Sequence, residues 1–188
     1  MHENLTPAIQ MVLESFKNGG KLLLCGNGGS SADCAHILGE FVKGFRRRRP
    51  LCDELKEKIG GEDWVSSLQY GLPAIDLTAN GALIAAVTND ISGESAYAQQ
   101  VLAYGKPGDV LIGISTSGNA ENVCRAMKVA RALGVHTIGM TGLTGGRMKE
   151  LSDILLNVPE TETYLVQEKH LPLYHQICMQ VEAALYEK

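Results

Sequence analysis

Two short segments rich in glycine and hydroxyl residues have the composition of phosphate-binding loops. The first, residues 26–31 with the sequence GNGGSS, follows an apolar run and precedes a helical pattern. Glycines let the backbone approach an anion closely, and the free N–H groups of a helix start favour negative charge. The segment lacks the GxGxxG dinucleotide pattern and the lysine of a Walker loop. An ordinary strand-to-helix turn capped by Ser30 or Ser31 is the alternative explanation.

The second segment, residues 113–119 with the sequence GISTSGN, places Ser115, Thr116 and Ser117 at the start of another helical pattern. Three adjacent hydroxyl residues exceed what one helix cap requires. Hydroxyl and backbone N–H donors can hold a phosphate without a lysine. In a doubly wound sheet the strands before the two segments are neighbours, and both segments then face one crevice. We therefore predict a phosphate-ester site rather than two unrelated capped turns.

A further group of residues could bind a metal or transfer protons. His36 and Glu40 stand four residues apart, so a helix places them on one face. With Gln167 and His175 they supply nitrogen and oxygen donors suited to Zn²⁺ or a similar divalent ion. Glu40 and His175 could instead be the base and acid that an aldose–ketose interconversion requires. A hydrogen-bonded or solvated pair on a helix surface remains the alternative.

The elements that must position these residues follow from hydrophobic periodicity. Apolar runs bounded by Gly, Pro or Asp predict five buried strands, at residues 21–25, 72–77, 109–114, 136–141 and 153–158. Helical patterns lie at residues 5–16, 31–42, 81–88, 95–104, 119–133, 147–151 and 171–186. Because strand and helix alternate, we predict an α/β fold with a mostly parallel sheet and helices on both faces.

One irregular region, residues 46–70, interrupts this alternation. Apolar residues four apart, Leu51, Leu55 and Ile59, predict an extra helical excursion from one domain that spans residues 1–188. The basic run at residues 46–49 is expected at the surface, as a helix C-terminal cap or at a subunit interface. Trp64 and Tyr70 are expected to pack the excursion onto its own domain.

The composition narrows the classes of function. A chain of 188 residues with 45% hydrophobic and 20% charged residues is sufficient for one globular domain. The net charge of −4 disfavours a nucleic-acid binder. The chain has neither a long apolar run nor a signal-peptide pattern, so we expect no membrane association and no secretion. Five cysteines without a CxxC pair predict reduced thiols in a cytoplasmic protein.

Several motifs occur together and in order along the chain. They are GNGGS at residues 26–30, HxxxE at His36 and Glu40, Asn89-Asp90, GDVLIGISTSGN at residues 108–119, and QExH at residues 167–170 followed by His175. This combination resembles the phosphoheptose isomerase branch of the sugar isomerase (SIS) domain family. The resemblance runs from about residue 5 to the end, apart from residues 46–70. It implies a three-layer α/β/α sandwich with a five-stranded, parallel, flavodoxin-like sheet.

The resemblance also implies an activity, namely isomerisation of sedoheptulose 7-phosphate to D-glycero-D-manno-heptose 7-phosphate through an enediol, with zinc and in homotetramers that have their sites at subunit interfaces. It implies that Glu40 is the catalytic base and His175 the acid. The implied metal ligands are His36, Glu40, Gln167 and His175. The implied substrate-binding residues are Asn27, Gly28, Gly29, Ser30, Asn89, Asp90, Ser115, Thr116, Ser117 and Gln167.

The chain departs from the family pattern in places. Ala120 stands where these isomerases usually carry a further serine, Tyr164 stands where some carry an acidic residue, and residues 46–70 are longer than their connection. A non-catalytic sugar-phosphate-binding regulator or protein-interaction module is therefore an alternative function. An etherase of the same family fits the HxxxE and QExH motifs less well. The expected partners are a sugar phosphate and further copies of the chain, as a tetramer or dimer.

Overall fold

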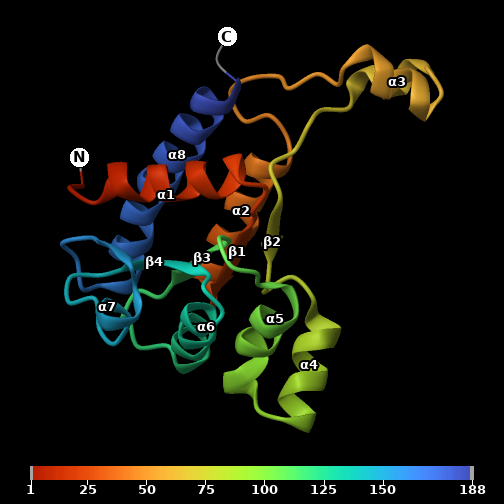
Figure 1. The fold of residues 1–188 in the computed structure, drawn as a ribbon. Coiled ribbons are helices and arrows are strands. Elements are labelled where there is room, and N and C mark those ends of the chain that lie inside the picture. The colour runs from red at the N-terminus through yellow and green to blue at the C-terminus, as the bar shows by residue number, and fades with distance from the viewer. Residues whose placement is uncertain (1, 187–188) are drawn as a thin grey trace.

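The structure, a computed structural model, describes residues 2–186, and in it five strands form one parallel sheet with helices on both faces (Figure 1). The strand order is β2-β1-β3-β4-β5. The strands are β1 (Leu22–Gly26), β2 (Ala74–Asp76), β3 (Val110–Ile114), β4 (His136–Thr141) and β5 (Ile154–Asn157). This order confirms the predicted α/β sandwich and makes β1 and β3 neighbours, so that the loops after them meet at one edge.

The helices follow the predicted alternation. They are α1 (Leu5–Lys17), α2 (Gly29–Val42), α3 (Asp53–Ile59), α4 (Gly81–Asp90), α5 (Ala96–Tyr104), α6 (Glu121–Ala132), α7 (Met148–Leu151) and α8 (Thr163–Tyr186), with 3₁₀ turns η1 (Asp63–Ser67) and η2 (Gly93–Ser95). None of the helices within residues 2–186 combines the length and the apolar content needed to cross a membrane.

The last helix differs from its prediction, because α8 begins at Thr163 instead of residue 171. Its first two turns bury only Val166 and His170, so they show little apolar periodicity. Pro172 lies inside the helix and does not end it. The early start places the whole QExH motif on α8.

The core lies on both faces of the sheet because successive strand residues point in opposite directions. In β1, Leu22 and Leu24 pack against α1, α2 and α8, whereas Leu23 and Cys25 pack against α5 and α6. Cys25 is buried, and burial raises the pKa of its thiol.

Helices α2 and α8 lie side by side and run in the same direction. Gly29 at the start of α2 lies against Gln167, and His36 further along α2 contacts Tyr174 and His175. Beyond the end of α2, the backbone N–H of Phe45 donates to Glu182. The two helices thus bring the HxxxE and QExH motifs together.

Arg49 is buried, which corrects the expectation that the whole basic run lies at the surface. Its guanidinium donates to Glu182 Oε1 at 2.8 and 3.1 Å and to the carbonyl of Phe41 at 2.7 Å. Glu182 also accepts the backbone N–H groups of Phe45 and Arg46, each at 2.8 Å. Burial raises the pKa of Glu182, but these hydrogen bonds and the charge of Arg49 outweigh it and lower the pKa overall.

The predicted excursion is a projecting arm, which we define as residues 51–69 (Figure 1). Its two ends lie together, because Pro50 and Gln69 form an antiparallel bridge and the N–H of Tyr70 donates to the carbonyl of Arg49 at 2.7 Å. Trp64 is exposed, and so is Tyr70, so the expectation that they pack onto the domain is wrong. Leu51 and Val65 fill the small interior of the arm, which leaves the aromatic rings outside.

Candidate functional site

A cavity of about 360 Å³ lies where the loops after β1 and β3 meet. Eight of the ten predicted substrate-binding residues line it, namely Asn27, Gly28, Gly29, Ser30, Ser115, Thr116, Ser117 and Gln167. The first loop, the second loop and the start of α8 therefore enclose one space. The carboxyl ends of neighbouring parallel strands are where open α/β sheets bind ligands.

The first loop turns sharply at Gly28, whose φ is +56°. Gly28 precedes α2 directly and no side chain within residues 2–186 caps the helix, so the alternative of a turn capped by Ser30 or Ser31 is wrong. The hydroxyl of Ser31 instead donates to Thr78 at 2.6 Å. A Cβ on Gly29 would lie 2.4 Å from Nε2 of Gln167, so glycine is required there for the Gln167 amide to rest on the loop.

Two side chains hold Asn27 in place at the edge of the cavity. The amides of Asn27 and Asn122 exchange two hydrogen bonds of 2.9 Å. The hydroxyl of Tyr97 donates to the carbonyl of Gly26 at 2.7 Å and to Asn27 Oδ1 at 3.1 Å. Burial raises the pKa of Tyr97 to about 12, so this hydroxyl keeps its proton at neutral pH. The first loop is therefore fixed to α5 and α6 before any ligand binds.

The second loop is held by its own polar groups and by the segment that follows β4. The hydroxyl of Ser117 accepts the N–H of Asn119 at 3.2 Å, and Arg147 donates to the carbonyl of Asn119 at 2.6 Å. By contrast, the hydroxyls of Ser30, Thr116 and Thr163 and the amide of Gln167 have no hydrogen-bond partner within residues 2–186. The cavity thus presents unused neutral donors, which suit a phosphate or a polyhydroxylated ligand.

A second polar group lies further along α2 and α8. Nε2 of His36 lies 3.2 Å from Oε1 of Glu40 and 3.4 Å from Nε2 of His175. The hydroxyl of Tyr174 lies 3.0 Å from Nδ1 of His36 and donates to Oδ1 of Asp33 at 3.2 Å. Burial raises the pKa of Asp33, an effect that Tyr174 and His36 partly offset. Burial and the nearby Asp33 charge raise the pKa of Tyr174.

The placement of protons in this group follows from these contacts. In one tautomer Nε2 of His36 donates to Oε1 of Glu40; in the other the Tyr174 oxygen, whose own proton points to Asp33, accepts the proton on Nδ1 of His36. The lone pair on Nε2 of His36 then faces Glu40 and His175. Oε2 of Glu40 is buried, accepts no hydrogen bond from residues 2–186 and lies 4.0 Å from Nζ of Lys43. Several acceptors therefore converge, and a proton or a cation between them would satisfy them.

The predicted metal ligands are only partly brought together. His36, Glu40 and His175 face one another, and their donor atoms fit a divalent ion chemically. Gln167 lies at the cavity instead. Among the residues that the structure describes, no three His, Cys, Asp or Glu side chains form a complete metal-binding arrangement. The ligand set therefore stays a prediction.

Some residues lie elsewhere than expected. Asn89 and Asp90 end α4, are exposed and are hydrogen-bonded to each other at 2.7 Å, away from the cavity lining. His170 of the QExH motif is buried, with Nε2 3.2 Å from the carbonyl of Thr141. The substrate contacts of Asn89 and Asp90 remain predictions.

The sequence patterns missed Thr163 in the cavity and Tyr174 beside His36. Thr163 precedes Gln167 by four residues, which is one helical turn, and an earlier start of the last helix would have revealed it. No pattern pointed to Tyr174, because its neighbour His36 is distant in sequence.

Comparison with known proteins places the chain among its relatives. The family model described as SIS domain matches residues 1–64 and 64–142. The phosphoheptose isomerase of Crocosphaera subtropica is 47% identical over 184 residues, which cover 98% of this chain and 84% of the relative. That of Roseiflexus sp. is 44% identical over 179 residues, or 95% of this chain and 81% of the relative.

Solved structures agree with these relatives. The structure of the phosphoheptose isomerase GmhA from Neisseria gonorrhoeae has a TM-score of 0.80 and 35% identity, with 96% of this chain and 86% of that chain covered. A phosphoheptose isomerase from Francisella tularensis gives a TM-score of 0.79 and 30% identity, with 95% and 84% covered. The chain therefore belongs to the SIS domain family, within its phosphoheptose isomerase branch.

Proposed function

We propose that the chain interconverts the ketose and aldose forms of a sugar phosphate, with sedoheptulose 7-phosphate and D-glycero-D-manno-heptose 7-phosphate as the pair. The placement of two polar groups along one pair of helices carries this proposal. Gly29 borders the cavity and His36 belongs to the second group, seven residues along α2, which is about 10 Å of helix. A seven-carbon sugar with a terminal phosphate is long enough to reach both.

The phosphate end of the substrate binds in the cavity. The hydroxyls of Ser115, Thr116 and Ser117 and the N–H groups of their loop donate to the phosphate oxygens. Thr163 adds a hydroxyl from α8, and the amides of Asn27 and Gln167 contact sugar hydroxyls. Because the loops are held in place by the contacts described above, binding requires little rearrangement of this wall.

The carbonyl end lies beside Glu40 and His175. Glu40 removes a proton from the carbon next to the carbonyl, while His175 donates a proton to the carbonyl oxygen, and an enediol forms. Glu40 then returns its proton to the neighbouring carbon, and His175 takes back a hydroxyl proton. This sequence conserves atoms and charge and runs in either direction.

His36, Glu40 and His175 would hold a divalent ion such as Zn²⁺, which when bound polarises the substrate carbonyl; the predicted fourth ligand, Gln167, lies at the cavity. We propose that Glu40 serves as both ligand and base. Oε1 faces His36, whereas Oε2 has no hydrogen-bond partner within residues 2–186. Tyr174 positions His36 through Nδ1 and so directs Nε2 toward the other donors.

The test is conversion of sedoheptulose 7-phosphate by the full chain in the presence of Zn²⁺. We expect turnover by the wild type and a loss of about 10²- to 10⁴-fold in Glu40→Gln, because a general base contributes rate of that order. Glu168→Gln, which makes the same change at an exposed carboxylate on α8, is the matched control. A thermal shift on adding the sugar phosphate measures binding separately.

The outcomes separate the proposed enzyme from a regulator. Turnover that depends on Glu40 supports the isomerase. Binding of the sugar phosphate by the wild type without turnover would contradict the isomerase and support the non-catalytic regulator. If Thr116→Val no longer binds the sugar phosphate and neither the wild type nor any variant turns it over, only the phosphate-binding part of the proposal would stand.

The proposal includes the oligomeric state of the protein and its compartment. We propose a homo-oligomer, tetramer or dimer, that acts on a small sugar phosphate in the cytoplasm. The net charge of −4 disfavours nucleic acid as a partner. All five cysteines are free thiols, in keeping with a reducing compartment.

A further inference from the structure

The arm exposes large apolar side chains. Ile59, Trp64 and Leu68 are 39%, 53% and 41% exposed, and α3 has no buried residue. Figure 1 shows α3 held away from the sheet and from the other labelled helices. Several large apolar side chains gathered on one projecting element mark an interaction surface more often than they mark solvent-exposed chain.

The far end of the arm is acidic. We call residues 53–63 the arm tip; it carries five acidic residues and two lysines. Lys56 pairs with Asp53 at 2.8 Å and Lys58 with Glu54 at 2.6 Å, within α3 itself. The remaining negative charge therefore comes from Glu57, Glu62 and Asp63.

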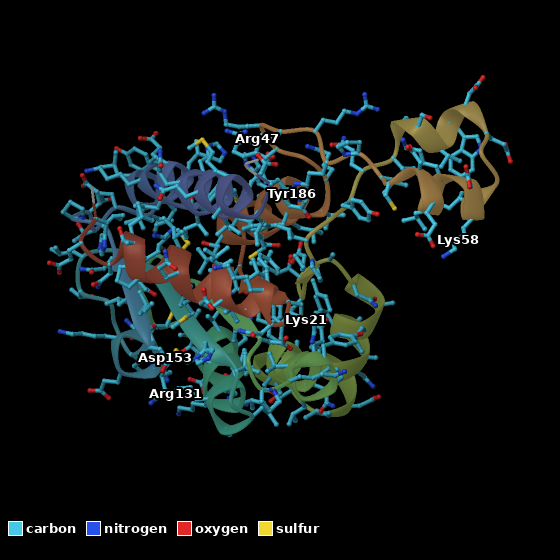
Figure 2. The ribbon with its side chains drawn as sticks, turned by 45° about the horizontal axis from the view of Figure 1, so that its top comes forward. Lys21, Arg47, Lys58, Arg131, Asp153 and Tyr186 are labelled. Carbon is cyan, nitrogen blue, oxygen red and sulfur yellow. The ribbon has the colours of Figure 1, made fainter. Side chains whose placement is uncertain are left out.

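The segment of the domain that leads into the arm is basic. We call residues 43–48 the arm root, where Lys43, Arg46, Arg47 and Arg48 are exposed. Arg46 and Arg47 border a hollow of about 350 Å³ beside Met179 and Ala183 of α8. The backbone of the root is fixed by Glu182, and Arg48 donates to the carbonyl of Ser66 in the arm at 2.7 Å. Figure 2 shows Arg47 at the end of α8 and Lys58 on the projecting arm, well separated from it.

We propose that the arm docks onto a second copy of this chain. Two arms lie antiparallel about a two-fold axis, so that each acidic arm tip meets the basic arm root of the other copy. One two-fold operation makes both contacts at once, as an isologous interface requires. Ile59, Trp64 and Leu68 are then covered between the arms. This interface does not depend on the proposed reaction.

Sedimentation velocity of the full chain over a range of concentrations tests the contact. We expect wild-type self-association, and a weakening of at least about tenfold in Arg46→Glu/Arg47→Glu and in Glu57→Lys/Asp63→Lys, as contacting charges couple on this scale. Combining all four substitutions restores opposite charges, so we expect the association constant to return to within about threefold of wild type. Raising the salt from about 0.1 M to about 1 M weakens the wild-type contact, because the Debye length falls.

Lys128→Glu/Lys149→Glu is the matched control, since it makes the same change of charge on α6 and α7 and leaves the association unchanged. A second variant replaces residues 52–68 with two glycines; the bond between Arg49 and Tyr70 closes the gap at the body. We expect this variant to keep its circular dichroism spectrum. Its association should weaken as it does in the charge-reversed proteins.

Three results would overturn the proposal. The first is a monomeric wild type at every concentration, which would assign the arm to another partner. The second is an unchanged mass after arm deletion or after either charge reversal. The third is failure of the combined reversal to restore association.

Discussion

The hydroxyl of Tyr174 lies 3.0 Å from Nδ1 of His36 and gives its own proton to Asp33. It joins α8 to α2 at the level where His175 meets His36. A hydrogen bond of this kind determines which nitrogen of an imidazole keeps its lone pair. Tyr174, which lies outside the cavity lining, therefore controls a donor atom of the site.

Replacing Tyr174 with phenylalanine should weaken zinc binding by about 10- to 100-fold, the usual effect of losing a partner that orients a ligand. Titration calorimetry against a competing chelator measures the affinity, and ¹⁵N NMR of the imidazoles reports a shift of His36 away from the Nδ1–H tautomer. Tyr104→Phe, at an exposed position, is the control. Unchanged affinity and an unchanged tautomer would contradict the assigned role.

Thr116→Val removes one free hydroxyl from the cavity and preserves its shape. A hydrogen bond to a charged group is worth about 1.5–3 kcal/mol, so KM for the sugar phosphate should rise by about 10- to 100-fold. The melting temperature should stay close to wild type, since this hydroxyl has no partner within residues 2–186. Initial rates over a range of substrate concentration measure KM, with exposed Thr161→Val as control. An unchanged KM would remove Thr116 from the site.

Thr163→Val tests the cavity residue that sequence patterns missed. One lost hydrogen bond of about 1 kcal/mol raises KM by about fivefold, whereas Thr163→Ser should retain the wild-type KM. Ala120 lines the same cavity. We therefore expect Ala120→Ser to recover part of the affinity in the Thr163→Val background. Equal KM values for the valine and serine variants would contradict a role for the hydroxyl.

The buried pair of Arg49 and Glu182 should be sensitive to loss of one partner only. Arg49→Met leaves a buried carboxylate without its cation and should lower the free energy of unfolding by about 3–5 kcal/mol. Arg49→Met/Glu182→Leu should recover much of the loss, because no unpaired charge remains. Urea denaturation measures both, with exposed Arg48→Met as control. A double variant less stable than Arg49→Met would contradict this account.

Stability should depend on pH through His170. Burial lowers the pKa of His170, so the unfolded chain binds its proton more readily than the folded chain. The stabilisation is complete above the unfolded pKa of about 6.5 and is lost as the pH falls below it, by at most about 1.4 kcal/mol per pH unit. Urea denaturation from pH 7.5 to 5 checks this, and His170→Gln should reduce the slope. An equal slope in both proteins would contradict it.

The sheet could be predicted from the sequence because its strands are buried on both faces. Residues 110–114, for example, are a continuous apolar run between turn residues, a pattern that depends on local sequence alone. The two loops were predictable for a similar reason. Glycine at position 28 and three successive hydroxyl residues are a local pattern typical of phosphate-binding loops. The meeting of both loops in one cavity followed from the strand order.

What could not be predicted depends on contacts distant in sequence. In the sequence Arg49 is one member of a basic run expected at the surface, and only the fold places Glu182, more than a hundred residues later, beside it. The start of α8 was hidden because its first turns face polar surroundings. Trp64 was expected to pack onto the domain because large aromatic side chains are usually buried, but the arm is too small to cover it.

The bridge between Pro50 and Gln69 has a consequence for how this protein can diverge. Because the chain leaves the body and returns at the same point, the length and sequence of the arm can change at little entropic cost and without disturbing the sheet. Relatives could therefore exchange one arm for another while the cavity stays as it is. Selection on assembly and selection on chemistry then act on separate parts of one gene.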